Sequence, residues 1–144
     1  MPEREVPNIR VFTAGDIEKI LEIEKGAFPK SNYPKAVLLH YANHDAFIFA
    51  VLETRQDIVG YIIFERGGHI ISTAVLPGHR RKGFGKMLFT YAHRQTHNNL
   101  WLEVRSKNRG AISFYIKMGM KIVGKTQNYY GDDDALIMRA PMIT

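Results

Sequence analysis

The sequence of 144 residues contains no cysteine. That absence excludes a disulfide framework, a thiol nucleophile and a cysteine-ligated zinc site. Long apolar runs are missing as well, since none reaches the ~20 residues that a membrane-spanning helix needs. We therefore expect a cytoplasmic protein with no membrane partner.

Negative charge is in short supply. The chain has 14 Asp and Glu residues against 20 Lys and Arg residues, which gives a formal net charge of +6. A basic chain can bind nucleic acid, or it can bind a phosphate-rich cofactor. The basic residues are spread along the sequence, so charge alone does not separate these two functions.

The sequence does contain the material for one globular core, with 45% hydrophobic residues. Apolar periodicity predicts strands near residues 8–12, 46–52, 58–64, 69–75, 100–104, 120–125 and 135–139. It predicts helices near residues 13–28, 34–41, 86–92 and 108–119. We expect a single α/β (α+β) domain over residues 1–144, with a mixed central sheet of about seven strands flanked by about four helices.

A glycine-rich, basic loop joins the strand that ends at Val75 to the helix that follows. Gly83 and Gly85 permit close approach of a ligand to the backbone, and the free N–H groups of a helix start attract anions. The basic residues around that point are Arg80, Arg81, Lys82 and Lys86. The loop thus favours a pyrophosphate site, and the alternative is a solvated turn. Its spacing fits neither the dinucleotide fingerprint nor the P-loop.

The loop, Arg80-Arg81-Lys82-Gly83-Phe84-Gly85, fits the pattern Arg/Gln-x-x-Gly-x-Gly/Ala. It resembles the acetyl-CoA pyrophosphate loop of the GNAT N-acetyltransferases. A second set of motifs agrees in order: Leu102-Glu-Val-Arg105, Asn108, Ala111, Phe114-Tyr115, Gly119 and Asn128-Tyr-Tyr130. Together they are similar to the RimI-like branch that acetylates protein N-termini, with its archaeal and eukaryotic relatives.

This resemblance implies transfer of an acetyl group from acetyl-CoA to an N-terminal α-amine, by direct attack in a ternary complex. The cofactor-binding residues that it implies are Thr73, Ala74, Val75, Arg80, Arg81, Lys82, Gly83, Phe84, Gly85, Lys86, Asn108 and Tyr115. In the family, backbone groups of the first three pair with the pantetheine arm, and one N–H would act as oxyanion donor. Asn108 would also cap its helix.

Glu103 is our candidate general base, because it is an ionisable residue inside an apolar strand beside the cofactor loop. An α-amine with a pKa near ~8 needs only one base, acting directly or through water. The alternative is that Glu103 faces solvent or pairs with Arg105, which alternation places on the same face. Tyr115 is the candidate general acid toward the departing sulfur, although spacing alone favours a core aromatic.

Two aromatic segments are candidate walls for the acceptor. Phe28, Pro29 and Tyr33 fall in the turn between the first two helices, and Tyr129 and Tyr130 fall in the last hairpin. In the resembling enzymes both segments flank the peptide slot; the alternative is plain surface aromatics. The acceptor could also be a protein lysine or a small amine. Ribosomal association or a partner subunit stays open, since relatives exist both alone and in complexes.

We predict no metal site. His93 and His97 stand four apart on a helix without a carboxylate partner, and the acidic run at residues 132–134 is more typical of a solvated loop than of a calcium site. A remaining alternative is a nucleic-acid-binding module with Arg80, Arg81 and Lys82 as phosphate contacts. We disfavour it, and it would show steep salt dependence without thioester turnover.

Overall fold

The computed structural model describes residues 6–55, 57–80, 82–97 and 99–140. Within them the chain forms seven strands and four α-helices in the predicted order, which confirms the α+β class. The elements are β1 (Asn8–Val11), η1 (Ala14–Asp16), α1 (Ile17–Ala27), α2 (Lys35–Asn43), β2 (Phe47–Thr54), β3 (Asp57–Glu65), β4 (Ile70–Val75), η2 (Pro77–His79), α3 (Phe84–Gln95), β5 (Trp101–Arg105), α4 (Arg109–Lys117), β6 (Lys121–Thr126) and β7 (Ala135–Arg139).

The strands form two antiparallel sheets, in the orders β1-β2-β3-β4 and β5-β7-β6. The predicted succession of antiparallel neighbours from β2 to β4 is confirmed. The two sheets meet at a parallel bridge between His69 and Trp101. Taken together, the two sheets are therefore mixed: the described strand pairs are antiparallel, and the edge strands β4 and β5 meet in parallel at this junction.

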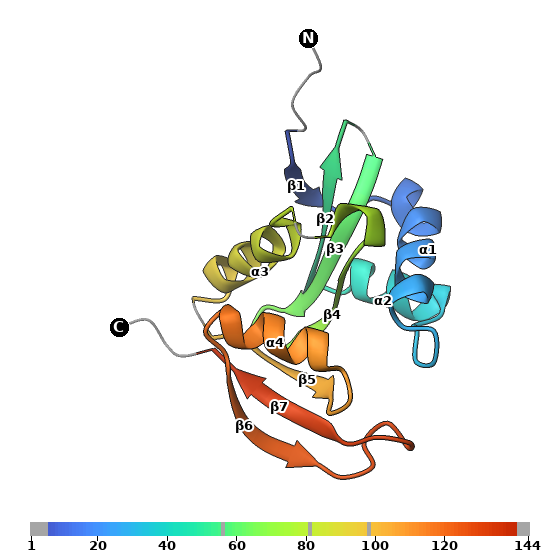
Figure 1. Ribbon diagram of the computed structural model, residues 1–144. Coiled ribbons are helices and arrows are strands. Elements are labelled where there is room, and N and C mark those ends of the chain that lie inside the picture. The colour runs from blue at the N-terminus through green and yellow to red at the C-terminus, as the bar shows by residue number, and fades with distance from the viewer. Residues whose placement is uncertain (1–5, 56, 81, 98, 141–144) are drawn as a thin grey trace.

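The junction of the two sheets lies at one end of β4 and β5. There the Trp101 N–H donates to the Gly68 carbonyl oxygen at 2.9 Å. Figure 1 shows that the two sheets diverge from this end and that α4 lies across the opening. The fold thus places two strand edges opposite each other beneath a helix.

The core is divided between the two faces of the sheets. On one face, side chains of α3 such as Leu88 and Ala92 pack with Leu102 and Val104 of β5. On the other, Ile17 and Ile20 of α1 pack with Tyr61 of β3. These helices expose one polar side and bury one apolar stripe, as the predicted periodicity requires. Among the described residues, no helix combines the length and apolarity that crossing a membrane requires.

Candidate active site

The predicted cofactor loop ends at a helix start without a side-chain cap. Gly83 precedes α3 with φ +82°, in the left-handed region that glycine adopts at little cost. The Met87 N–H donates to the Gly83 carbonyl oxygen at 3.0 Å and opens the helical ladder. The N–H groups of Phe84, Gly85 and Lys86 precede that bond, so none has an acceptor within the helix. This geometry suits an anion.

Cationic side chains accompany these amides. Lys82 and Lys86 are exposed. Arg80 folds back, and its Nε donates to the Val75 carbonyl oxygen at 3.2 Å. Arg81, which we also expect in this set, lies outside the described residues. Gly85 has a packing role too, because a Cβ there would lie 3.3 Å from the Phe114 ring of α4.

The outer edge of β4 presents backbone groups toward β5. The Leu76 N–H donates to the Val59 carbonyl oxygen at 2.8 Å, and the register pairs Ala74 with Tyr61. Because antiparallel ladders alternate, the N–H and C=O groups of Ala74 face β3. Those of Thr73 and Val75 point away from β3, toward the gap. Of the three predicted residues, only these two can offer backbone hydrogen bonds to a ligand in the gap.

Glu103 lies at the junction of the two sheets. Its Oε2 atom is 2.7 Å from Nε2 of His69, and the His69 ring stacks on Trp101 with ring centroids 3.9 Å apart. Glu103 and Arg105 share one face of β5, as alternation predicts, while Leu102 and Val104 are buried on the other. Glu103 pairs with His69, however, whereas Arg105 bonds to Asp132.

Helix α4 carries the two other predicted cofactor contacts. Asn108 caps the helix as predicted, because its Oδ1 accepts from the Ala111 N–H at 3.1 Å. Tyr115 packs against the core on the α3 side. Burial, with a smaller contribution from Tyr130, raises the pKa of the Tyr115 phenol above its ordinary value. The phenol is therefore protonated at neutral pH and is a hydrogen-bond donor.

The tyrosines of the two predicted acceptor walls, Tyr33, Tyr129 and Tyr130, lie near one another. Burial raises the pKa of Tyr130 to about 12, and the next contributions come from Glu103 and then Tyr129. Burial raises the pKa of Tyr33 as well, with contributions from both loop tyrosines. Tyr129 is exposed, and its ring stands nearly perpendicular to that of Tyr130. Three predicted wall tyrosines thus lie within electrostatic reach of one another, and two of them lie within reach of Glu103.

The other two predicted wall residues follow α1 directly. Phe28 is half-buried, and its N–H donates to the Glu24 carbonyl oxygen at 2.9 Å; Pro29 is exposed. Lys30, the next residue, brings its Nζ to 3.8 Å from an Asp132 carboxylate oxygen in the β6–β7 loop. The loop that bears Phe28 and Pro29 therefore contacts the loop that bears the two tyrosines.

A buried polar cluster behind Tyr33 escaped sequence analysis. The carboxylate of Glu24, fully buried on α1, accepts from the hydroxyls of Tyr61 and Ser72. It also accepts from the Tyr33 N–H at 3.0 Å. The signal was present, because Glu24 stands four residues after Ile20 on the apolar stripe of α1. His69 carries no such sequence signal, because its partner Glu103 stands 34 positions further along the chain.

Each carboxylate of the acidic run at residues 132–134 accepts hydrogen bonds from the protein. Among the described residues, no group of three or more His, Asp or Glu side chains could hold a metal ion. The groups that the described part of the site offers for chemistry are the paired Glu103 and His69, the phenols and the backbone donors.

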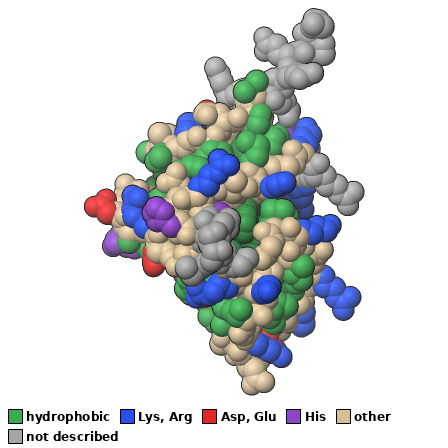
Figure 2. Space-filling view, turned by 90° about the vertical axis from the view of Figure 1, so that its left-hand side faces the viewer, with side chains coloured by type: hydrophobic (Ala, Val, Ile, Leu, Met, Phe, Trp, Pro, Cys, Tyr) green, Lys and Arg blue, Asp and Glu red, His purple; other side chains and the backbone are tan. Residues whose placement is uncertain are grey.

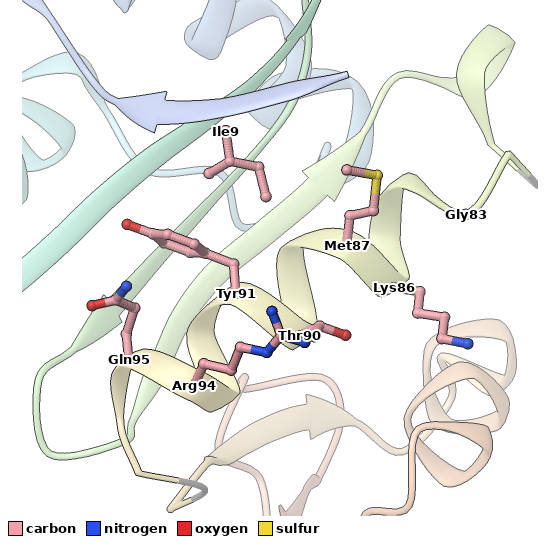
Figure 3. A pocket seen from close by; sticks show the side chains of 8 residues that line it. All are labelled: Ile9, Gly83, Lys86, Met87, Thr90, Tyr91, Arg94 and Gln95. Carbon is pink, nitrogen blue, oxygen red and sulfur yellow. The ribbon is translucent and has the colours of Figure 1, made fainter. Parts of the chain in front are cut away.

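A groove of about 480 Å³ runs along the outer side of α3. Figure 3 shows Ile9 of β1 facing Met87 and Tyr91 of α3. The groove shares Gly83 and Lys86 with the cofactor loop, and Arg94 adds a second cation. On the side of the molecule that carries α3, Lys and Arg side chains are interspersed with hydrophobic ones (Figure 2). The groove continues the basic loop and does not reach Glu103.

Comparisons with known proteins agree with this geometry. Residues 17–120 match the acetyltransferase (GNAT) family. The N-alpha-acetyltransferase of Sulfolobus acidocaldarius is 33% identical over 155 aligned residues, covering 93% of this chain and 92% of that protein. The structure of Ard1 from Thermoplasma volcanium superposes with a TM-score of 0.83 at 29% identity, covering 96% of this chain and 99% of that one.

A third comparison concerns the fold alone. The ribosomal-protein-S18-alanine N-acetyltransferase from Escherichia coli has a TM-score of 0.83 at 22% identity, covering 96% of both chains. The architecture of two splayed sheets with α4 across the opening is thus shared over nearly the whole length. On the family match and the similarity to the Sulfolobus enzyme, this chain belongs to the acetyltransferase (GNAT) family.

Proposed function

We propose that this enzyme transfers the acetyl group of acetyl-CoA to the N-terminal α-amine of proteins. One observation carries the proposal: the Glu103–His69 pair lies at the junction of the two sheets, within electrostatic reach of Tyr129 and Tyr130. The relative from Sulfolobus acidocaldarius, which bears the name N-alpha-acetyltransferase, supports the choice of acceptor. The proposal includes a cytoplasmic location. It leaves open whether the enzyme reaches its substrates by binding the ribosome or through a partner subunit.

The cofactor side of the site fits acetyl-CoA, which supplies the activated thioester. In our proposal the amides of Phe84, Gly85 and Lys86 bind the pyrophosphate at the start of α3, where the helix dipole favours negative charge. The cations that neutralise it are Arg80, Arg81, Lys82 and Lys86. Thr73 and Val75 bind the pantetheine arm through their outward backbone groups, and Ala74 contributes only its side chain. The side-chain oxygen Oδ1 of Asn108 accepts the capping hydrogen bond, so the side-chain NH₂ group is the part that donates to the cofactor.

Glu103 is the proposed general base. Its carboxylate takes the proton that the α-ammonium must lose before the nitrogen can attack the thioester carbonyl. The hydrogen bond with His69 fixes the orientation of that carboxylate. The outward N–H of Thr73 or Val75 stabilises the negative charge that develops on the carbonyl oxygen. As the C–N bond forms, the nitrogen loses its second proton to solvent, and as the C–S bond breaks, CoA leaves as a thiolate that takes up a proton from solvent.

The role of Tyr115 is narrower than that of a full proton donor. A phenol whose pKa is raised above its ordinary value holds its proton more tightly than a thiol with a pKa near ~8.5. Complete proton transfer from Tyr115 to a departing thiolate would therefore be uphill. We propose that Tyr115 donates a hydrogen bond to the sulfur and stabilises its developing charge.

The acceptor assignment is tested by measuring CoA release with two matched peptides. One has a free N-terminus and no lysine; the other has a blocked N-terminus and one internal lysine. We expect turnover of the first only, because a lysine amine is about two and a half pKa units harder to deprotonate. Turnover of the blocked peptide would reassign the enzyme to protein lysines. Turnover of neither, with activity on a small polyamine, would overturn the protein substrate.

A further inference from the structure

The β6–β7 loop is fastened by its acidic run. Each of the three carboxylates has a different set of donors. Asp133 accepts from the Ser106 hydroxyl at 2.5 Å and from the Lys107 N–H at 3.1 Å. Asp134 accepts from the Asn128 N–H at 2.9 Å and pairs with Lys125 at 3.1 Å. Two of the carboxylates therefore fix the ends of the loop, and the third, Asp132, contacts Lys30 of the α1–α2 loop and Arg105 of β5.

Arg105 connects that third carboxylate to strand β5. Its Nη1 donates to Oδ1 of Asp132 at 2.8 Å. Its guanidinium carbon lies 4.3 Å from the centre of the Tyr130 ring, which is the geometry of a cation–π contact. Only 23% of the Arg105 side chain is exposed, so these contacts are partly shielded from solvent. Arg105 shares its strand face with Glu103 and therefore links the loop directly to the strand that carries the base.

We propose that Arg105 is a positioning residue, which holds Tyr130 and Asp132 so that the β6–β7 loop forms one wall of the acceptor slot. This inference rests on the proposed function and adds a residue to the same site. The Lys30–Asp132 pair extends the connection to the α1–α2 loop. Both of its partners are strongly exposed, so this ion pair contributes little by itself. Of Lys30 and Arg105, the two cations that pair with the Asp132 carboxylate, Arg105 is the one whose charged group is planar.

Within the part of the chain that the structure describes, Arg105 bonds to Asp132 and stacks on Tyr130 and makes no hydrogen bond to the cofactor loop, which separates its role from a general one in catalysis. Loss of its contacts should weaken binding of the acceptor peptide while the affinity for acetyl-CoA stays unchanged. A lysine keeps the charge but cannot stack its planar group on Tyr130 while donating to Asp132. Arg105→Lys should therefore restore only part of the function that Arg105→Met loses.

Steady-state kinetics on the whole enzyme test this inference, with each substrate varied at saturation of the other. For Arg105→Met we expect the peptide KM to rise about tenfold, the change for ~1.4 kcal/mol of lost positioning. The acetyl-CoA KM should stay within about twofold. The matched control is Arg139→Met on the neighbouring strand β7, where the Arg139 side chain, among the described residues, donates only to Oδ1 of Asn99. Equal effects of the two variants on the peptide KM would overturn the inference.

A second measurement does not depend on which amine is acetylated. The Tyr130 N–H donates to the Asp133 carbonyl oxygen at 3.1 Å inside the loop. We expect amide hydrogen exchange at Tyr130 to be at least about fivefold faster in Arg105→Met than in wild type, because the loop opens locally more often. Unchanged exchange would overturn the inference. A silent wild-type enzyme with faster exchange in the variant would instead count only against the proposed function.

Discussion

Among the described residues, the Glu103 carboxylate has a hydrogen-bond partner in His69, whose ring lies flat against Trp101. Stacking at 3.9 Å with ring planes 7° apart fixes the imidazole, and the imidazole fixes the carboxylate. Tyr129 and Tyr130 are close enough for Glu103 to contribute to their raised pKa values. A carboxylate that is oriented by a hydrogen bond and lies near protonated phenols is suited to accept a proton from an incoming amine.

Glu103→Gln tests this assignment, because glutamine keeps the shape and a hydrogen bond with His69 but cannot accept the proton. We expect kcat/KM for a free N-terminal peptide to fall by about 100-fold or more, with the acetyl-CoA dissociation constant unchanged. Kinetics and calorimetric binding measure the two quantities. Glu65→Gln, at the exposed end of β3, is the control and should behave as wild type. A Glu103→Gln enzyme that kept a third of its activity would exclude Glu103 as the base.

At the level of elements, a two-point ion pair between Arg10 and Asp16 holds the entry to α1. Asp16 accepts from Nη1 and Nη2 of Arg10 at 2.8 and 2.9 Å and from the Thr13 N–H at 2.7 Å. These bonds tie β1 to the start of α1, which in turn carries Glu24 to its buried position behind Tyr33. The acceptor side of the site is therefore supported from the first strand onward.

This contact predicts how folding stability depends on pH. Arg10 lowers the pKa of Asp16 below its ordinary 3.8, so the ionised carboxylate stabilises the fold above that value. That stabilisation is lost as the pH falls through the lower pKa of the folded state. Asp16→Asn should cost about 1–2 kcal/mol at neutral pH and flatten the acid limb of the stability curve. Urea unfolding between acid and neutral pH measures both effects.

The exposed Asp57→Asn is the matched control, since its carboxylate is 61% exposed and only 3.7 Å from Lys19. It should leave the unfolding free energy within about 0.5 kcal/mol of wild type. Parallel acid limbs for wild type and Asp16→Asn would show that Arg10 does not hold the Asp16 carboxylate in solution.

At the scale of the whole molecule, function depends on how two sheets are joined. Sequence analysis predicts most of the secondary structure, because apolar periodicity is local and the α3 loop and Asn108 cap follow from neighbouring residues. It does not predict the contact of His69 with Glu103, since 34 positions separate them. Nor does it predict that Asp132 and Asp133 fasten a loop to β5 and the turn after it, because their donors stand at least 26 positions earlier in the chain. The site is assembled by tertiary contacts, which local sequence patterns do not predict.

At the sheet junction, position 68 requires glycine. Its φ of +122° disfavours other residues, and a Cβ would lie 1.6 Å from the Asn99 carbonyl oxygen. Gly68→Ala should therefore force the sheets apart at His69 and cost at least about 3 kcal/mol of unfolding free energy. Urea unfolding measures the loss. Gly26→Ala, with nothing within 4 Å of its Cβ on α1, is the control and should be neutral or stabilising.

In the proposed function, the gap between the two sheets presents an N-terminal α-amine to acetyl-CoA. The most direct measurement is a competition within one peptide that has a free N-terminus and a single internal lysine. After partial reaction with the wild-type enzyme, tandem mass spectrometry locates the acetyl group. We predict that it lies on the α-amine with the lysine unmodified, and that Glu103→Gln slows its appearance. Acetylation of the lysine ahead of the α-amine would contradict this assignment.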